Sequence, residues 1–151
     1  LYLVLGGGTV LPNYSREMEE LVSSLGIQDR VIITGFLKLP DLRYLLDKCE
    51  FVVLPAIYSI AASGPLAQVF AHKKAVIVSD LGVYREEIVD GVNGLLSRVG
   101  DVNDLEKKME ILLEDKQIKE ILSMNVSIIK DERGWGNVAG RTKDVYTDIT
   151  L

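Results

Sequence analysis

The chain has 151 residues, enough for one domain that would bury roughly 70% of its extended surface on folding. Its composition, 48% hydrophobic and 26% charged, is that of a folded globular protein and excludes a disordered chain. The net charge of -5 and the lack of a basic run argue against a nucleic-acid partner, because phosphate backbones are bound by clustered Lys and Arg.

Cysteine use and hydropathy narrow the class further. Cys49 is the only cysteine, which excludes an intrachain disulfide and a thiolate zinc site and favours a reducing, cytoplasmic compartment. Apolar runs stay below the roughly 18 residues of a membrane span, and the start lacks a signal-peptide pattern. Because the sequence opens with Leu1 inside an apolar run, we expect it to begin partway through a longer protein.

The first third of the chain alternates strand and helix patterns. The run "LYLVLGGG" predicts a buried parallel strand that enters a tight turn at its glycines. Helical spacing of apolar residues follows over 13–25, with Gly26 as the stop. The segment "RVIITGF" predicts a second strand with its turn at Gly35, and a helix opens at Pro40.

The rest of the chain continues this alternation. Predicted elements are a strand over 51–56, a helix from 65 to 72, a strand over 75–80, a short helix over 86–89 and a turn into a last strand over 89–97. Three helices close the chain. The first is amphipathic, with Leu105, Met109 and Leu112 inward and Asp101 or Asp104 as its cap. Such alternation predicts a Rossmann-like α/β fold, a parallel sheet with helices on both faces.

Ligands of open parallel sheets bind at the carboxyl ends of the strands. Three ends stand out in this sequence: the glycines that close the first strand, the turn at Gly35, and the small residues before Leu66. For the first of these, a dinucleotide fingerprint fails because Leu11 stands where a glycine is needed, and a turn that requires positive φ is the simpler interpretation.

The helix that starts near Pro65 admits two interpretations. Its unpaired amides and dipole, with Ala61, Ala62, Ser63 and Gly64 leaving room, suit an anion such as a diphosphate. Alternatively, Ser63 caps the helix, Pro65 occupies its first turn, and the small residues only allow close packing.

The sequence gives little support for a catalytic histidine or for a metal site. His72 is the lone histidine and lies near a predicted helix end, where it can interact with the helix dipole. Without a second histidine or a cysteine pair, this chain holds neither a Ser-His-Asp constellation nor a His-rich metal site.

Several segments together resemble one family, the retaining glycosyltransferases of family 4. They are "RVIITGF", "CEFVVLPAIYS", "SGPLAQVFAHKKAVIVSDLGVYREEIVDGVNGLL" and "GDVNDLEKKMEILLED". The most specific part is 75–96, where the spacing matches at Asp80, Gly82, Glu86, Asp90, Gly91, Asn93 and Gly94. The resemblance runs over 1–151 and implies one donor-binding domain, the C-terminal half of a GT-B fold.

The resemblance also implies the binding residues. The turn at Gly35 would border the nucleotide base, the first glycine loop would line the interdomain cleft, and the helix start would hold the diphosphate through backbone N–H groups. Small residues before that helix would border the sugar, and Gln68 would face the ribose. The implied substrate-binding set is Gly7, Gly8, Gly35, Phe36, Leu37, Ala61, Ala62, Ser63, Gly64, Pro65, Leu66 and Gln68.

Two departures concern the chemistry. Most members of this family carry two glutamates eight residues apart, where this chain has Ile60 and Gln68. A glutamine amide can still bond a ribose diol, whereas Ile60 offers no polar group to a sugar. No catalytic residue is assigned.

Two parts of the family's architecture are also missing from this sequence. One is a first strand and helix, with an Arg and a Lys that neutralise the diphosphate. The other is the N-terminal domain that holds the acceptor, so we expect the isolated chain to be inactive. The absent strand would lie in the middle of the sheet, between the strands ending near Leu5 and Leu54, and we expect preceding residues or another chain to fill the gap.

The first functional hypothesis is therefore a cytoplasmic glycosyltransferase that uses a nucleoside-diphosphate sugar, without a metal or cofactor. The alternatives are a non-catalytic nucleotide-binding or assembly module and, more weakly, a nucleotide-sugar epimerase fragment. An acceptor at a membrane surface is left open.

Overall fold

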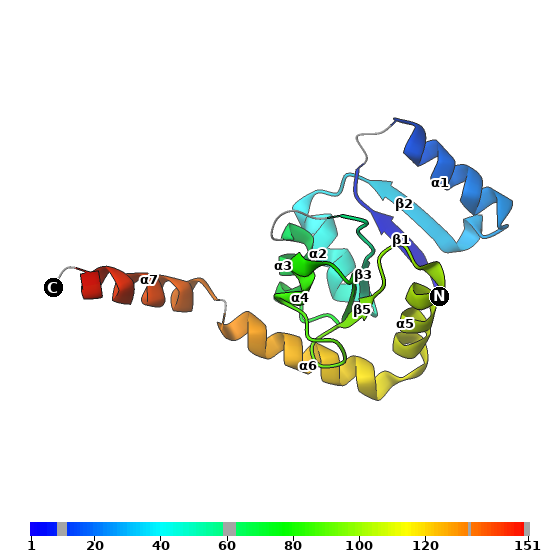
Figure 1. Ribbon diagram of the computed structural model, residues 1–151. Coiled ribbons are helices and arrows are strands. Elements are labelled where there is room, and N and C mark those ends of the chain that lie inside the picture. Colours follow the sequence, from blue (N-terminus) through cyan, green and yellow to red (C-terminus); the bar gives the residue numbers. More distant parts are fainter. Residues whose placement is uncertain (9–11, 59–62, 133, 150–151) are drawn as a thin grey trace. The chain divides into compact units, whose positions relative to one another are not determined.

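The computed structural model describes residues 1–8, 12–58, 63–132 and 134–149 (Figure 1). The chain forms two compact units, Leu1–Asp47 and Lys48–Leu151. The first unit contains β1 (Leu3–Gly6), α1 (Pro12–Ser24), a 3-10 turn (Gln28–Arg30), β2 (Val31–Gly35) and α2 (Leu39–Lys48), whose last residue opens the second unit. The second unit contains β3 (Val52–Leu54), α3 (Gly64–Ala71), β4 (Val76–Ser79), α4 (Gly82–Arg85), β5 (Leu95–Ser97), α5 (Val102–Glu114), α6 (Lys116–Glu132) and α7 (Trp135–Ile149).

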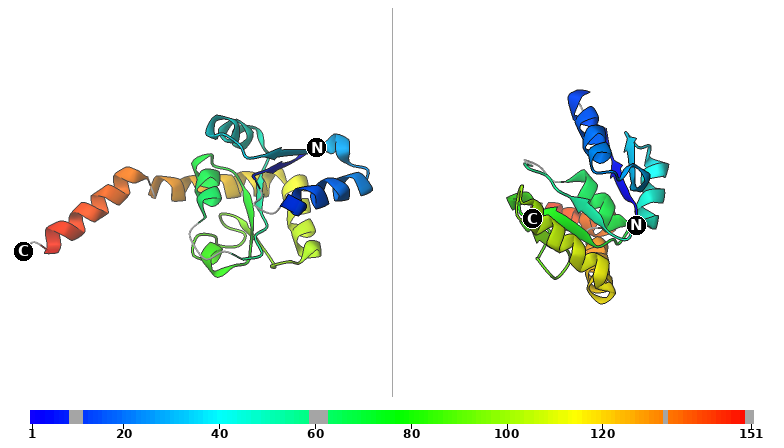
Figure 2. Two further views of the ribbon diagram at one scale, coloured as in Figure 1. Left: turned by 90° about the horizontal axis from the view of Figure 1, so that it is seen from above. Right: turned by 90° about the vertical axis from the view of Figure 1, so that its right-hand side faces the viewer.

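The sheet of the first unit pairs β1 with β2 in parallel. The two strands run side by side in Figure 1 and in both views of Figure 2. The register places Leu5 opposite Ile33 and Gly6 opposite Gly35, so it shifts by one residue between them. The prediction that the first strand is buried is wrong, because Leu3 and Val4 are 45% and 37% exposed. The physical reason is that β1 has one strand neighbour, β2, in this sheet.

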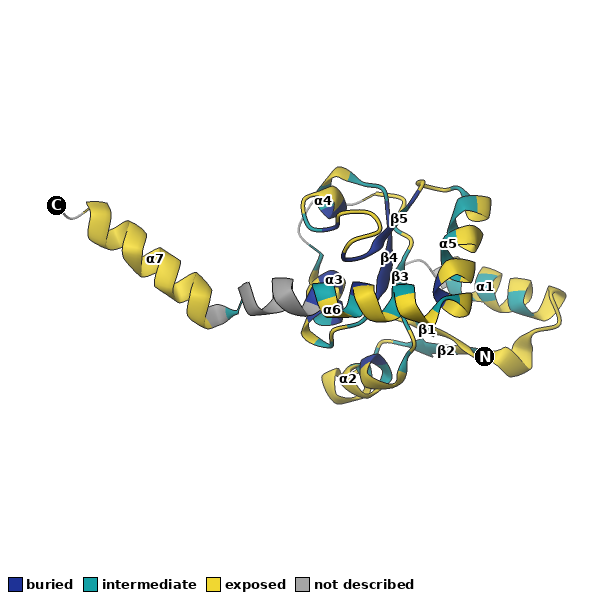
Figure 3. Cartoon of the chain, turned by 90° about the horizontal axis from the view of Figure 1, so that it is seen from below, coloured by how far each residue is buried: buried dark blue, intermediate teal, exposed yellow. Residues whose placement is uncertain are grey.

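The sheet of the second unit has the order β3-β4-β5, and all its strands are parallel. The central strand β4 has a neighbour on each side, and Val76, Ile77 and Val78 are 0% exposed. Figure 3 shows β4 in dark blue, as buried. Continuous apolar runs of this kind are typical of parallel strands that are covered on both faces.

The core of the second unit lies between this sheet and the helices α5 and α6. Its buried members are Ala75, Ile77, Leu95, Leu112 and Leu122, with Leu105 and Met109 partly buried against them. The inward face predicted for α5 is thus confirmed. Asp101 is the cap, because its carboxylate accepts a hydrogen bond from Asp104 N at 2.9 Å.

One short helix lies elsewhere than predicted. The sequence predicts it over 86–89, whereas α4 spans Gly82–Arg85 and the chain then turns. The Asn93 side chain explains this turn, because its Oδ1 accepts from Val89 N at 2.7 Å and its Nδ2 donates to Glu87 O at 2.8 Å. A side chain that takes backbone partners in this way competes with helix formation.

Candidate functional site

Two of the predicted loops meet in the first unit. The backbone N–H of Gly7 donates to Gly35 O at 3.0 Å. A Cβ atom added to Gly8 would lie 3.6 Å from the Cβ atom of Phe36. The glycines after β1 and the turn after β2 therefore form one surface at the carboxyl ends of these strands, as expected for neighbouring parallel strands.

Backbone conformation explains the glycines of this surface. Gly7 has φ of 135° and Gly35 has φ of 62°, both in the region that residues with a side chain rarely adopt. The prediction that the glycines after the first strand serve a turn of positive φ is confirmed at Gly7. Gly6 lies close to Leu37 instead, because an added Cβ would be 3.1 Å from Leu37 Cδ1, and that side chain would have to shift by a few tenths of an ångström.

The side chain of Phe36 projects from the turn into solvent. It is 86% exposed, although aromatic side chains are usually at least partly buried. Leu37, next in the chain, is half-buried. The surface thus combines a backbone without side chains at Gly7 and Gly8 with one projecting aromatic ring, an arrangement that suits a flat ligand.

The third predicted loop lies in the second unit, at the start of α3. Ser63 is the N-cap, and its Oγ accepts a hydrogen bond from Leu66 N at 3.2 Å. Pro65 lies in the first turn, where its missing N–H costs nothing. The capping interpretation is therefore confirmed. Binding of an anion here stays a prediction, and it would use Gly64, beside which an added Cβ would have nothing within 4 Å.

The remaining predicted site residues divide into two groups. Gln68 is half-buried on α3, two residues after Leu66, whose side chain is 2% exposed in the core. Ala61 and Ala62 lie outside the described residues, as does Ile60, one of the two departures from the family pattern.

The motif over 75–96 builds the carboxyl end of β4. Asp80 follows β4 and accepts two hydrogen bonds from the Arg85 guanidinium, one of them at 2.7 Å from Nη2. These bonds and the positive charge lower the pKa of Asp80 below its usual value. Further along, Asp90 Oδ1 accepts from Leu96 N at 2.8 Å, and Gly94 leaves no room for a Cβ beside Ile88. These residues shape the fold of the segment.

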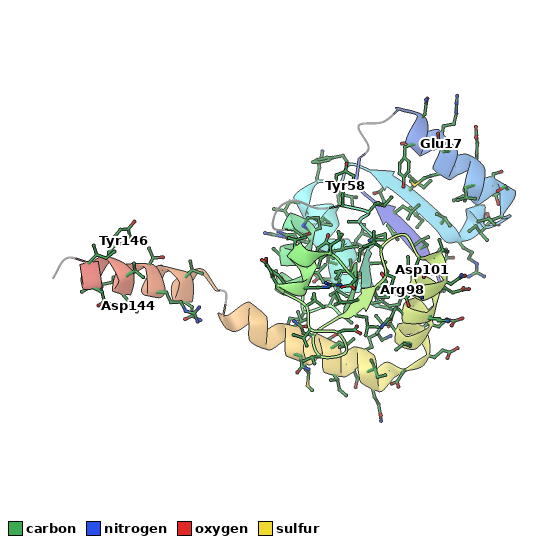
Figure 4. The ribbon with its side chains drawn as sticks, viewed as in Figure 1. Glu17, Tyr58, Arg98, Asp101, Asp144 and Tyr146 are labelled. Atoms are coloured by element: carbon green, nitrogen blue, oxygen red, sulfur yellow. The ribbon has the colours of Figure 1, made fainter. Side chains whose placement is uncertain are left out.

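Sequence reasoning missed two polar partners in this unit. No partner was predicted for Arg85, yet its guanidinium forms an ion pair with the Asp80 carboxylate. Arg98 lies beside Asp101 in Figure 4, with its Nη2 2.9 Å from Asp101 Oδ2. A signal existed for the second pair, since opposite charges three residues apart at a helix start commonly meet.

The chain is similar in sequence to a known protein family and to several curated proteins. The family described as "Glycosyl transferases group 1" matches residues 1–128. The chain belongs to this family. Among its curated relatives, an alpha-D-kanosaminyltransferase of Streptomyces kanamyceticus is 23% identical over 99% of the chain and 38% of the relative. A D-inositol 3-phosphate glycosyltransferase of Xylanimonas cellulosilytica is 26% identical over 98% of the chain and 35% of the relative.

A solved structure shares the fold of this chain. The structure of Anabaena Alr3699/HepE in complex with UDP superposes with a TM-score of 0.84 at 22% identity, covering all of this chain and 41% of that one. The predicted Rossmann-like fold is thus confirmed as the C-terminal half of GT-B glycosyltransferases. The chain spans less than half the length of these relatives.

Metal-ligand clusters and membrane-spanning helices are both absent from the described residues of this group 1 chain. Within 1–8, 12–58, 63–132 and 134–149, no three or more His, Cys, Asp or Glu side chains gather as metal ligands would. Over the same ranges, none of the helices has both the length and the apolar character needed to cross a bilayer.

Proposed function

We propose that the chain is the donor-binding half of a retaining glycosyltransferase, which moves a sugar from a nucleoside-diphosphate sugar to an acceptor held by another part of the protein. Membership of the group 1 family carries this proposal. The names of the relatives support it, and so does a neighbour of the same fold that was solved with UDP-glucose.

The surface of the first unit would bind the nucleoside. An exposed Phe36 ring can stack on a base, and the glycines at 7 and 8 let the backbone approach the ligand closely. In this proposal the base lies against the Gly35 turn. Stacking of this kind tolerates several bases, so the turn alone does not choose among uridine, guanosine and adenosine diphosphates.

The start of α3 would bind the diphosphate. The positive end of a helix dipole favours anions, and the Ser63 hydroxyl can donate its hydrogen while accepting from Leu66 N. Stabilising the departing diphosphate in this way lowers the barrier to transfer, because negative charge grows on it as the sugar leaves. We assign that task to backbone groups and cations rather than to a metal ion.

A second candidate is a nucleotide-binding module without transfer chemistry. The specific observation in its favour is Ile60, which stands where most members of the resembling family carry a glutamate. An aliphatic side chain supplies neither a hydrogen bond to the sugar nor charge to the transition state. Backbone binding of a diphosphate would survive this change.

Titration separates the two candidates. The full-length protein is titrated with UDP, GDP and ADP, and then with their sugars in the presence and absence of candidate acceptors. Acceptor-dependent release of a nucleoside diphosphate supports the transferase. Tight binding without turnover supports the module, and no binding of any of these nucleotides contradicts both.

A substitution tests the sugar side of the proposal. Ile60→Glu is expected to change the selectivity among nucleotide sugars while leaving the affinity for the bare nucleoside diphosphate unchanged. Ile57→Glu is the matched control, because it adds the same charge three residues earlier on a side chain that is 73% exposed. If both substitutions act alike, the effect is one of net charge, and the placement of Ile60 beside the sugar is wrong.

A further inference from the structure

The end of β2 carries an extra residue. Because Leu5 lies opposite Ile33 and Gly6 opposite Gly35, Thr34 has no partner of its own in β1. Such a bulge bends a strand and re-aims the residues that follow, and bulges are common beside functional sites. Here the residues that follow are the turn Gly35–Leu37, where the proposed function places the nucleoside.

The Thr34 side chain ties this bulge to β1. Its hydroxyl Oγ1 lies 3.3 Å from Leu5 O and 3.0 Å from Gly35 O, and it is part-buried. Gly35 O also accepts from Gly7 N at 3.0 Å. One carbonyl group therefore accepts from both a side-chain donor and a backbone donor. The bond from Gly7 connects the glycine loop with the turn, and the bond from Thr34 holds the same oxygen from within β2.

The direction of Phe36 depends on this carbonyl. The peptide that contains Gly35 O is the one that leads into Phe36, so fixing the oxygen fixes the plane from which the ring departs. Gly35 has φ of 62°, a conformation that a glycine leaves easily when it is not held. Hydrogen bonds from Gly7 and Thr34 to its carbonyl oxygen restrain it.

We infer that Thr34 is a positioning residue: its hydroxyl holds the Gly35 turn so that Phe36 meets the nucleoside of the donor. This inference rests on the proposed function. It concerns the nucleoside end of the donor, which the proposed function assigns to the Gly35 turn.

The test removes the hydroxyl without changing its bulk. In the full-length protein, Thr34→Val and the smaller Thr34→Ala are compared with Thr34→Ser, which keeps the hydroxyl. Thr142→Val is the matched control, since its hydroxyl only donates to Val138 O within α7 at 2.8 Å. Each protein is titrated with the nucleoside diphosphate that binds the wild type most tightly and with inorganic pyrophosphate.

Thr34→Val and Thr34→Ala are expected to weaken nucleoside-diphosphate binding about tenfold, the usual effect of losing one part-buried hydrogen bond. Affinity for pyrophosphate should stay the same, and Thr34→Ser and Thr142→Val should bind as the wild type does. Equal losses for both ligands, or no rescue by serine, would overturn the positioning role while leaving the proposed function intact. A wild type that binds none of the nucleotides would overturn both.

Discussion

The strands β1 and β4 differ in burial far more than in sequence. Both have four residues, both are parallel, and both are rich in branched apolar side chains. Yet Val76–Val78 are 0% exposed in the second unit, whereas Leu3 is 45% exposed in the first. The difference lies in their neighbours, because β4 pairs on both sides and lies under helices, while β1 pairs with β2. Apolar character predicts a strand, and its neighbours decide its burial.

The loops of the two units differ in a similar way. In the first unit, backbone conformation defines the loop ends, with positive φ at Gly7 and Gly35. In the second unit, the side chains of Ser63 and Asp101 cap the starts of α3 and α5, although Gly91 and Gly100 also have positive φ. Backbone-defined turns tolerate few substitutions but expose ligand-facing amides, and capped helix starts have already satisfied some of theirs.

The largest difference between the two units is expected when a leucine side chain is truncated to alanine. Leu112→Ala in the second unit is expected to lower the free energy of unfolding by about 2–5 kcal/mol, because Leu112 is 0% exposed in a packed core. Leu21→Ala in the first unit, at a side chain that is 58% exposed, should cost within about 0.5 kcal/mol. Urea unfolding measures both. Equal costs would mean that something covers the first unit in solution.

Local signals in the sequence predicted much of this fold. Gly7, Gly35, Ser63 and Asp101 were found because glycine in a turn and a polar residue before a helix act on the nearest backbone. These effects depend on a few neighbouring residues. They can therefore be read from a single sequence.

Other features depend on partners that the sequence does not rank. The burial of β1 depends on which strands flank it, and the position of α4 depends on Asn93 bonding Val89 N four residues back. The bulge at Thr34 needs the register between two strands, which is fixed only by pairing with β1. The features that sequence reasoning missed thus depend on which strands become neighbours, or on a side chain that bonds a group outside its own element.

Two glycines of the family motif in the second unit differ in the room they leave for a side chain. Gly94→Ala is expected to cost about 1–3 kcal/mol, because the new Cβ would lie 3.1 Å from Ile88 and Val76 in a packed region. Gly82→Ala is the control, since nothing lies within 4 Å of its added Cβ. Thermal unfolding followed by circular dichroism separates them. A neutral Gly94→Ala would show that these side chains repack freely.

The same helix ending occurs in both units with different residues. After α1, Gly26 has φ of 66° and donates to Ser23 O; after α3, Lys73 has φ of 54° and donates to Phe70 O. Lys73→Gly should therefore stabilise by about 0.5–1 kcal/mol, and Gly26→Lys should destabilise by about 1 kcal/mol, since only glycine adopts this conformation without steric cost. Unfolding midpoints in urea measure the two shifts. Shifts of the same sign would contradict this explanation.

The smallest difference in stability between the two units is expected from their ion pairs. The Arg85 guanidinium lowers the pKa of Asp80, so this carboxylate adds stability at neutral pH that is lost as the pH falls from the usual aspartate value of 3.8 through its lower folded value. Since the Arg85 side chain is 62% exposed, solvent screens the pair and its contribution should be small. Asp80→Asn should then be less stable than the wild type at pH 7 and equally stable once Asp80 is protonated.

The control for this prediction comes from the first unit. Arg16 and Glu20 form an exposed pair at 3.5 Å within α1, and Glu20→Gln should change the free energy of unfolding by less than about 0.5 kcal/mol at either pH. Both substitutions remove one negative charge, so an effect of net charge alone would make them equal. A larger loss for Asp80→Asn at pH 7, which disappears in acid, would assign the difference to the two hydrogen bonds from Arg85. Equal losses would show that the Asp80–Arg85 pair does not stabilise the carboxyl end of β4.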